Sequence, residues 1–139
     1  MKLDINQAID VLNSGDPETI EQYLLEVNPD VHARGRIHTT ALALYKLLEQ
    51  QLADSSVEAL LSVHQRLDDS VWKRNVLFLA MEILLVEDKA GEAEALIARL
   101  DGAYVYQGYR IVLRHYAGRG DLENYHRVLK RADRRRNRN

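Results

Sequence analysis

Apolar residues recur at helical spacing along nearly the whole chain. No segment shows the sustained two-residue alternation of β-branched and aromatic residues, bounded by hairpin turns, that marks half-buried strands. Because the apolar positions repeat with the period of a helix face, we expect an all-α protein. The pattern predicts eight helices, at residues 4–13, 17–27, 30–53, 56–67, 71–87, 91–100, 104–117 and 121–133.

Helix starts are marked most clearly at two places. Asp16 is predicted to cap the second helix, with Pro17 at its first position, where proline's fixed φ fits and its missing N–H is not needed. The segment Ser55-Ser56-Val57-Glu58 predicts a capping box at the start of the fourth helix. Gly35 falls inside the third segment, which we predict as one helix.

The predicted helices alternate between a more apolar member and a shorter, more polar one, as the helices of stacked hairpins do. When the second helices of the four pairs are aligned, the offsets between them are 37, 36 and 29 residues. The aligned positions are Ile20, Val57, Ala93 and Leu122, each followed three residues later by Tyr23, Leu60, Leu96 and Tyr125. A helix pair that repeats at such intervals is typical of an α-solenoid. We therefore expect about four antiparallel helical hairpins stacked in a single domain over residues 1–133.

The last predicted hairpin carries an ordered set of aromatic, aliphatic, turn and small residues. In chain order these are Tyr109, Val112, Tyr116, the Gly120–Asp121 turn, Leu129 and Ala132. The set resembles the tetratricopeptide repeat and is similar to the related pentatricopeptide motif. It departs from the tetratricopeptide pattern at Leu113, where that family has a small residue, and at Tyr125, where it has Ala; both should widen the packing. The resemblance implies a helical hairpin, packing roles for Tyr109 and Tyr116, and the binding of other proteins.

Charge is distributed unevenly along the chain. The overall formal charge of −2 hides a net −9 over residues 1–102 and a net +7 over residues 103–139, where ten Lys and Arg residues meet only three Asp and Glu. Five of the seven tyrosines also lie in this basic end. Such asymmetry bears on partners and not on the fold. The sequence therefore predicts a binding module whose contact surface is the basic C-terminal hairpin.

Specific partner contacts are predicted within the basic end. Tyr106, Arg110 and Arg114 are spaced four residues apart, so they share one stripe of the seventh helix. The other candidates are basic residues of the last helix and of residues 134–139, a segment with no apolar anchor that we predict to be a disordered arm. These candidates are Arg127, Lys130, Arg131, Arg134, Arg135, Arg136 and Arg138.

Three interpretations of these charges compete. The arginines could dock an acidic protein or peptide, or neutralise the phosphates of RNA or single-stranded nucleic acid while exposed tyrosines stack on its bases. They could also be solvated charges that favourably meet a helix dipole. The negative charge of residues 1–102 would repel phosphate, so we predict an adaptor or chaperone-like protein with an acidic partner, and keep nucleic acid as the alternative. The acidic front of one copy could also meet the basic end of another, giving a homo-oligomer.

Motifs for catalysis and metal binding are absent from the sequence. There is no cysteine, no Gly-rich phosphate loop, no serine-nucleophile elbow and no His-Glu-x-x-His motif. His32 and His38 are six residues apart, on nearly opposite sides of a helix, with no further ligand at a metal-binding interval. Glu82 lies in the most apolar helix and is expected to be a rim carboxylate paired with a cation such as Lys73 or Lys89. We expect no enzymatic activity, cofactor or metal.

The remaining expectations concern the core and the location of the protein. Trp72 and Phe78 flank the most apolar helix and are predicted to fill the core. The apolar window over residues 76–86 is about half the length of a membrane-spanning helix, and the first residues lack the pattern of a secretory signal. Together with the lack of cysteine, this predicts a cytoplasmic protein without contact with a membrane.

Overall fold

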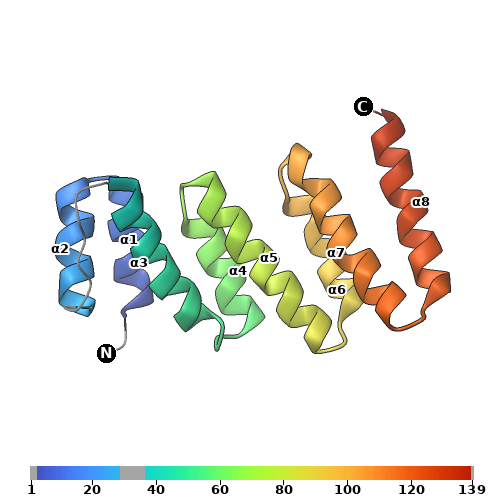
Figure 1. The fold of residues 1–139 in the computed structure, drawn as a ribbon, viewed down its shortest axis with the longest axis horizontal. Helices are drawn as coiled ribbons and strands as arrows, with labels where there is room; N and C mark the ends of the chain where they lie inside the picture. The colour runs from blue at the N-terminus through green and yellow to red at the C-terminus, as the bar shows by residue number, and fades with distance from the viewer. Residues whose placement is uncertain (1–2, 29–36, 139) are drawn as a thin grey trace. The chain divides into compact units, whose positions relative to one another are not determined.

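The computed structural model describes residues 3–28 and 37–138, and side chains over residues 3–28 and 40–136. Over these residues the chain is all-α, with no strand (Figure 1). The α-helices are α1 (Ile5–Ser14), α2 (Pro17–Val27), α3 (Ile37–Leu52), α4 (Val57–Arg66), α5 (Ser70–Val86), α6 (Ala90–Ala95), α7 (Val105–Gly118) and α8 (Leu122–Arg138). Two short 3-10 helices, η1 (Leu96–Arg99) and η2 (Gly102–Tyr104), lie between α6 and α7. The all-α prediction is confirmed.

Most predicted helices begin and end within a residue or two of the observed ones, and three differ. The first seven residues of the predicted third helix, 30–36, lie outside the described residues. The predicted sixth helix is split, because α6 ends at Ala95 and the chain tightens into η1. The predicted eighth helix ended at 133, with a disordered arm after it, whereas α8 continues to Arg138. Residues 134–138 contain neither Gly nor Pro, and arginine is a good helix former, so nothing stops the helix from propagating.

Contacts between backbone segments divide the chain into two compact units, residues 1–76 and 77–139, with the boundary inside α5. The sequence pattern predicted one domain over residues 1–133.

In the first unit, α1 packs against α2 and α3, and α2 packs against α3. Helix starts follow the local sequence: the Asp16 carboxylate caps α2 by accepting a hydrogen bond from the Thr19 N–H at 3.3 Å, as predicted. At α4 the cap is Ser56, whose Oγ accepts from the Ala59 N–H at 3.2 Å. The predicted capping box was therefore one residue too early.

Aromatic stacking and a reciprocal pair of hydrogen bonds join α5 to its neighbours in this unit. The rings of Trp72 and the fully buried Tyr45 stack with centroids 4.5 Å apart, so Trp72 belongs to the packing as predicted. The His64 ring donates from Nδ1 to the Lys73 carbonyl at 2.8 Å, and Lys73 Nζ donates to the His64 carbonyl at 2.8 Å. These contacts fix α5 against α3 and α4.

In the second unit, α7 is the central helix and packs against α6, η1 and α8. Tyr109, Val112 and Tyr116 on α7 are buried, and Val128 of α8 is fully buried. Tyr109 and Tyr116 thus occupy packing positions, as the sequence analysis expected. The turn between α7 and α8 is made by Gly120, whose φ of 68° lies in the left-handed region that glycine adopts without strain.

Gly108 allows α7 to approach the segment that follows α6. A Cβ placed on Gly108 would lie 2.6 Å from Cδ1 of Leu100 and 3.3 Å from Cγ1 of Ile97, two buried side chains. We therefore expect Gly108→Val to destabilise the protein by about 1 to 3 kcal/mol through overpacking. Gly118→Val, on the same helix with no atom within 4 Å of its built Cβ, is the matched control and should change stability by less than about 0.5 kcal/mol. Urea unfolding followed by circular dichroism measures both, and equal effects would contradict the close approach.

Candidate binding groove

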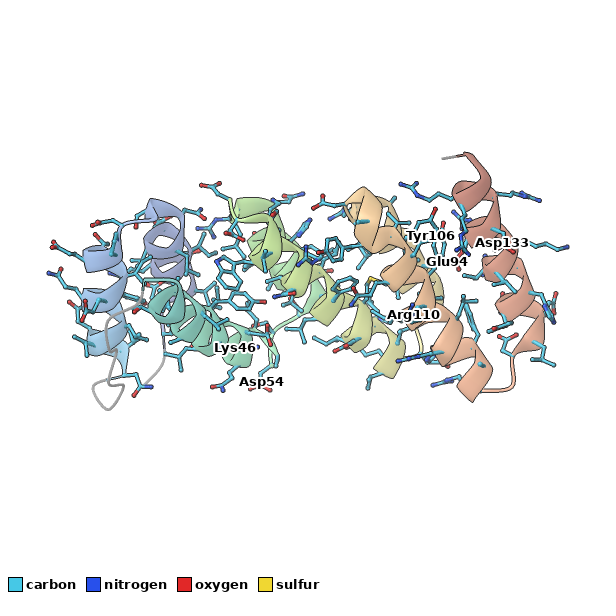
Figure 2. The ribbon with its side chains drawn as sticks, turned by 45° about the horizontal axis from the view of Figure 1, so that its top comes forward. Lys46, Asp54, Glu94, Tyr106, Arg110 and Asp133 are labelled. Carbon is cyan, nitrogen blue, oxygen red and sulfur yellow. The ribbon has the colours of Figure 1, made fainter. Side chains whose placement is uncertain are left out.

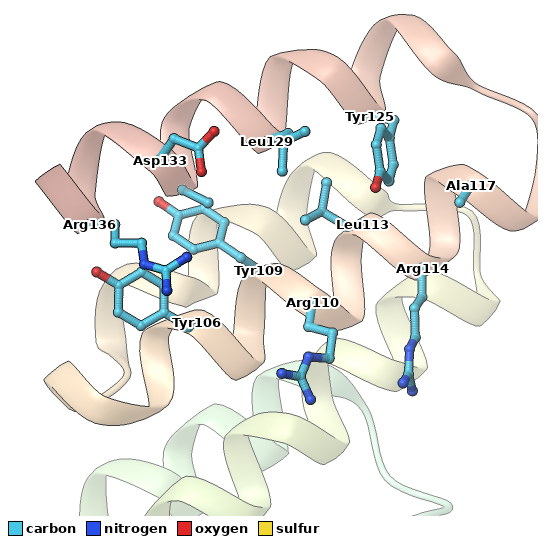
Figure 3. A pocket seen from close by; sticks show the side chains of 11 residues that line it. Tyr106, Tyr109, Arg110, Leu113, Arg114, Ala117, Tyr125, Leu129, Asp133 and Arg136 are labelled. Carbon is cyan, nitrogen blue, oxygen red and sulfur yellow. The ribbon is translucent and has the colours of Figure 1, made fainter.

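A groove of about 360 Å³ runs between α7 and α8 (Figure 3). Helix α7 contributes Tyr106, Tyr109, Arg110, Leu113, Arg114 and Ala117 to its lining. Helix α8 contributes Tyr125, Leu129, Ala132, Asp133 and Arg136. Four of the predicted partner contacts are therefore brought together in one concave site: Tyr106, Arg110, Arg114 and Arg136.

The turn between the two helices sets their antiparallel course. Gly120 supplies the left-handed turn, and the Asp121 carboxylate caps α8 by accepting a hydrogen bond from the Asn124 N–H at 3.2 Å. Hydrogen bonds from Asn124 hold the pKa of the Asp121 carboxyl below its usual value, so the cap is charged at neutral pH. Residues near the start of α7 therefore face residues near the end of α8 across the groove.

The floor of the groove is apolar and comes from both helices. Leu113 of α7 and Leu129 of α8 point toward one another, and Tyr125 lies beside them (Figure 3). Leu113 and Tyr125 are the two positions at which the sequence departs from the tetratricopeptide pattern, and both are only half-buried. Bulky side chains at both places keep the two helices from closing on each other, since interaxial distance depends on the side chains at the contact. The expected widening thus coincides with an open apolar groove.

The rim of the groove is cationic. Arg110 and Arg114 project from α7, and Arg136 lies at the end where Tyr106 faces α8 (Figures 2 and 3). All three arginines are exposed, and among the described side chains none of them forms an ion pair with an acid. Asp133 is the one acid in the lining, which leaves the groove with a net charge of +2. The site therefore combines an apolar floor with unneutralised positive charge.

Two other predicted contacts, Arg127 and Arg131, are engaged inside the fold. Arg127 donates from Nη1 and Nη2 to the two carboxylate oxygens of Glu94 on α6, both at 2.8 Å. Arg131 donates from Nη1 to Oε1 of the same carboxylate at 2.6 Å. The Glu94 side chain is only 6% exposed, whereas those of Arg127 and Arg131 are 46% and 56% exposed. This three-residue cluster, here called the Glu94 clasp, fastens α8 to α6.

The Glu94 clasp is electrostatically well matched. The hydrogen bonds from Arg127, together with the charges of both arginines, hold the pKa of Glu94 below its ordinary value although burial opposes this. Because Arg127 and Arg131 donate hydrogen bonds to Glu94, they are poorer candidates for partner contacts than the sequence suggested. Glu94 lies 33 and 37 residues before its partners, so no local spacing could have revealed the cluster.

The remaining predicted contacts lie on other faces of α8 or outside the described side chains. Lys130 and Arg134 line a second hollow along α8, of about 440 Å³, together with Glu123, His126 and the two clasp arginines. Arg135 is exposed and lines neither the hollow nor the groove. Arg138 is the last residue of α8, and its side chain lies outside those described.

Glu82 does not form the ion pair that the sequence predicted. Glu82 is exposed, and the two cations considered for it are used elsewhere: Lys73 bonds the His64 carbonyl and Lys89 pairs with Glu87 at 3.5 Å. The expected pairing of Glu82 with either lysine is therefore wrong. Its position explains this, since a residue on the open side of α5 keeps its charge in water and needs no partner.

No group of three or more potential metal ligands occurs within the part of the chain that the structure describes. His32 lies outside that part, and the side chain of His38 is not described, so the spacing argument made for these two histidines stays a sequence argument. None of the described helices combines the length and the apolar character needed to cross a membrane.

Comparison with known proteins adds no relative to this picture. No protein-family model matches the sequence, and neither the curated proteins nor the solved structures give a match. The function must therefore be argued from the groove itself.

Proposed function

We propose that the protein is a non-enzymatic interaction module that binds an acidic segment of another protein through the groove between α7 and α8. The observation that carries this proposal is the combination of an apolar floor at Leu113 and Leu129 with the exposed arginines Arg110, Arg114 and Arg136 on the rim. An apolar floor gives affinity when it is covered, and rim charges give the encounter rate and the choice of partner.

The helical-repeat interpretation supports the same proposal. The pairing of α7 with α8 and the residues at its packing positions fit a tetratricopeptide-like hairpin, whose general use is to bind proteins. The earlier helices would be further hairpins of a short α-solenoid that carries this terminal pair. Under this proposal the protein acts as an adaptor or chaperone-like binder in the cytoplasm.

An acidic protein fits the site better than a nucleic acid does. Base stacking needs exposed aromatic faces, but Tyr109 and Tyr116 are only 8% and 6% exposed, and Tyr106 and Tyr125 line the groove. Arg127 and Arg131, which would have been phosphate ligands, already bond Glu94. Fewer free cations mean fewer phosphate contacts, and phosphate contacts supply most of the affinity for single strands.

Fluorescence anisotropy tests the proposal with two labelled probes: an 18-residue synthetic peptide rich in Glu and Leu, and a mixed-sequence single-stranded 20-mer. We expect the peptide to bind at both 50 and 200 mM salt, and the oligonucleotide to bind only weakly at 50 mM. About six phosphate contacts would instead make oligonucleotide affinity fall on the order of a thousandfold over this range, and that result would establish the nucleic-acid alternative. Failure of the peptide to bind at 50 mM would contradict the proposed function.

A further inference from the structure

We infer that the occupant of the groove is an amphipathic α-helix of about three turns, with its apolar stripe on the floor and two carboxylates, four residues apart, facing Arg110 and Arg114. This inference rests on the proposed function and names the form of the acidic segment. It follows from the backbone chemistry of the groove, from its length and from the spacing of its charges.

The walls of the groove favour a helical occupant over an extended one. Both walls are α-helices, whose backbone N–H and C=O groups are already used within α7 and α8 apart from their ends. An extended peptide finds no strand edge there, so its own backbone groups would lie unpaired over Leu113 and Leu129. A helix satisfies its backbone internally and presents only side chains to the apolar floor. A helical occupant therefore leaves the fewest backbone groups without a hydrogen bond.

The length of the groove sets the length of the occupant. Its lining on α7 runs from Tyr106 to Ala117, which is about 16 Å along a helix axis, or three turns. A partner helix of that length carries apolar anchors at i, i+3 or i+4, and i+7, the spacing by which amphipathic helices enter apolar grooves. Leu113 and Leu129 lie toward the middle of this span, where anchors contribute most, and Tyr125 lies at its Ala117 end (Figure 3).

The charges on the rim match carboxylates on a helix. Arg110 and Arg114 are four residues apart, about 6 Å along the axis of α7. Glutamates at i and i+4 on a helix lying along α7 have the same spacing, so each can meet one guanidinium. At the other wall Asp133 lies near Arg136, so a third acid at that end would meet a like charge as well as a cation. The acids of the partner are thus expected along α7.

Three 18-residue peptides test this inference. The first has Leu at i, i+4 and i+7, with Glu at flanking positions four residues apart. The second has the same composition in an order that breaks the apolar stripe. The third is the first with one central residue replaced by Pro. We expect the first to bind at least about tenfold more tightly than the other two, and to gain helical circular dichroism on binding. Equal affinity of all three would overturn the helical form and leave acidic binding intact, whereas binding by none would overturn the proposed function itself.

A pair of protein variants locates the bound helix. Leu113→Gln alters the floor and is expected to weaken the first peptide by about tenfold. Leu122→Gln, which changes a leucine that is 61% exposed and outside the groove, should weaken it by less than about twofold. Thermal melts of both variants confirm folding. Equal affinity of Leu113→Gln and wild type would overturn the inference.

Sedimentation of the protein without peptide tests a second copy as the occupant. The acidic residues 1–102 make this the competing occupant within the chain itself. At 50 mM salt we expect the sedimentation coefficient of the wild type to stay the same as the protein concentration rises. We expect the same of Leu113→Gln. Self-association that this substitution abolishes would assign the groove to a second copy and overturn the inference.

Discussion

Reversing both charges on the α7 rim, by Arg110→Glu with Arg114→Glu, is expected to weaken binding of the acidic helical peptide by about a hundredfold. Each substitution removes an attraction and creates a repulsion at a site that the peptide's carboxylates approach closely, and juxtaposed like charges across an interface cost several kcal/mol. A hundredfold change corresponds to about 2.7 kcal/mol, which two such contacts can supply after partial solvent screening. Anisotropy at 100 mM salt measures the change.

The matched control is Lys130→Glu with Arg134→Glu. These two residues are also four apart and exposed, and the change in net charge is the same, but they line the second hollow on α8 and not the groove. We expect this pair to weaken the peptide by no more than about tenfold, through the loss of long-range attraction alone. An equal or larger effect from the control pair would move the binding site to the hollow that Lys130 and Arg134 line on α8.

Removing both arginines of the Glu94 clasp, by Arg127→Ala with Arg131→Ala, is expected to destabilise the second unit by about 3 kcal/mol at pH 7. The double variant strands a carboxylate whose side chain is only 6% exposed, and a buried charge without a partner is strongly unfavourable. Glu94→Gln leaves no buried charge, and the two arginines it releases are already about half exposed. Its effect should therefore be smaller, about 1 to 2 kcal/mol.

The pH dependence of stability separates the clasp from simple loss of packing. In the wild type, Arg127 lowers the folded-state pKa of Glu94, so the clasp stabilises the protein fully above pH 4.5, the carboxyl's ordinary value, and less as the pH falls through the lowered pKa. In the double alanine variant the lowering by the arginines is lost, and we expect the desolvation that remains to raise the pKa of Glu94, so the penalty should fade as the carboxyl takes up a proton.

The stability difference between wild type and the double alanine variant should therefore be largest near neutral pH and shrink below about pH 4.5. Urea unfolding between pH 3.5 and 7 measures it. A difference that stays constant over this range would contradict a charged Glu94 in the clasp.

The sequence predicts the helices well because their signals are local. Asp16 with Pro17 marks the start of α2, and the resemblance of the last hairpin to the tetratricopeptide pattern implied packing roles for Tyr109 and Tyr116, which are buried. The end of α8 was predicted too early, because an arginine run without apolar residues reads as solvated chain although each arginine favours helix. The composition of residues 134–138 favours a disordered segment. The helix propensity of arginine and the unbroken hydrogen-bond ladder of α8 favour a helix, and they prevail.

The groove was only partly predictable, since it depends on which residues meet across helices. The four-residue spacing of Tyr106, Arg110 and Arg114 correctly placed them on one side of α7. The roles of Arg127 and Arg131 could not be separated from those of the other basic residues, because their partner Glu94 is distant in the chain. Leu113 and Tyr125 did give a signal, as bulky residues where a closely packed hairpin would have small ones, but the sequence did not show that they would line an open site.

Nuclear magnetic resonance of the methyl-labelled protein with the unlabelled helical peptide is the most direct test of a docking site between α7 and α8. We predict intermolecular contacts between the methyl groups of Leu113 and Leu129 and the leucines of the peptide. We also predict that the ring signals of Tyr125 shift when the peptide binds. Saturation of binding with these signals unchanged, and with the shifts confined to residues 1–76 or to the Lys130 and Arg134 face, would contradict the account.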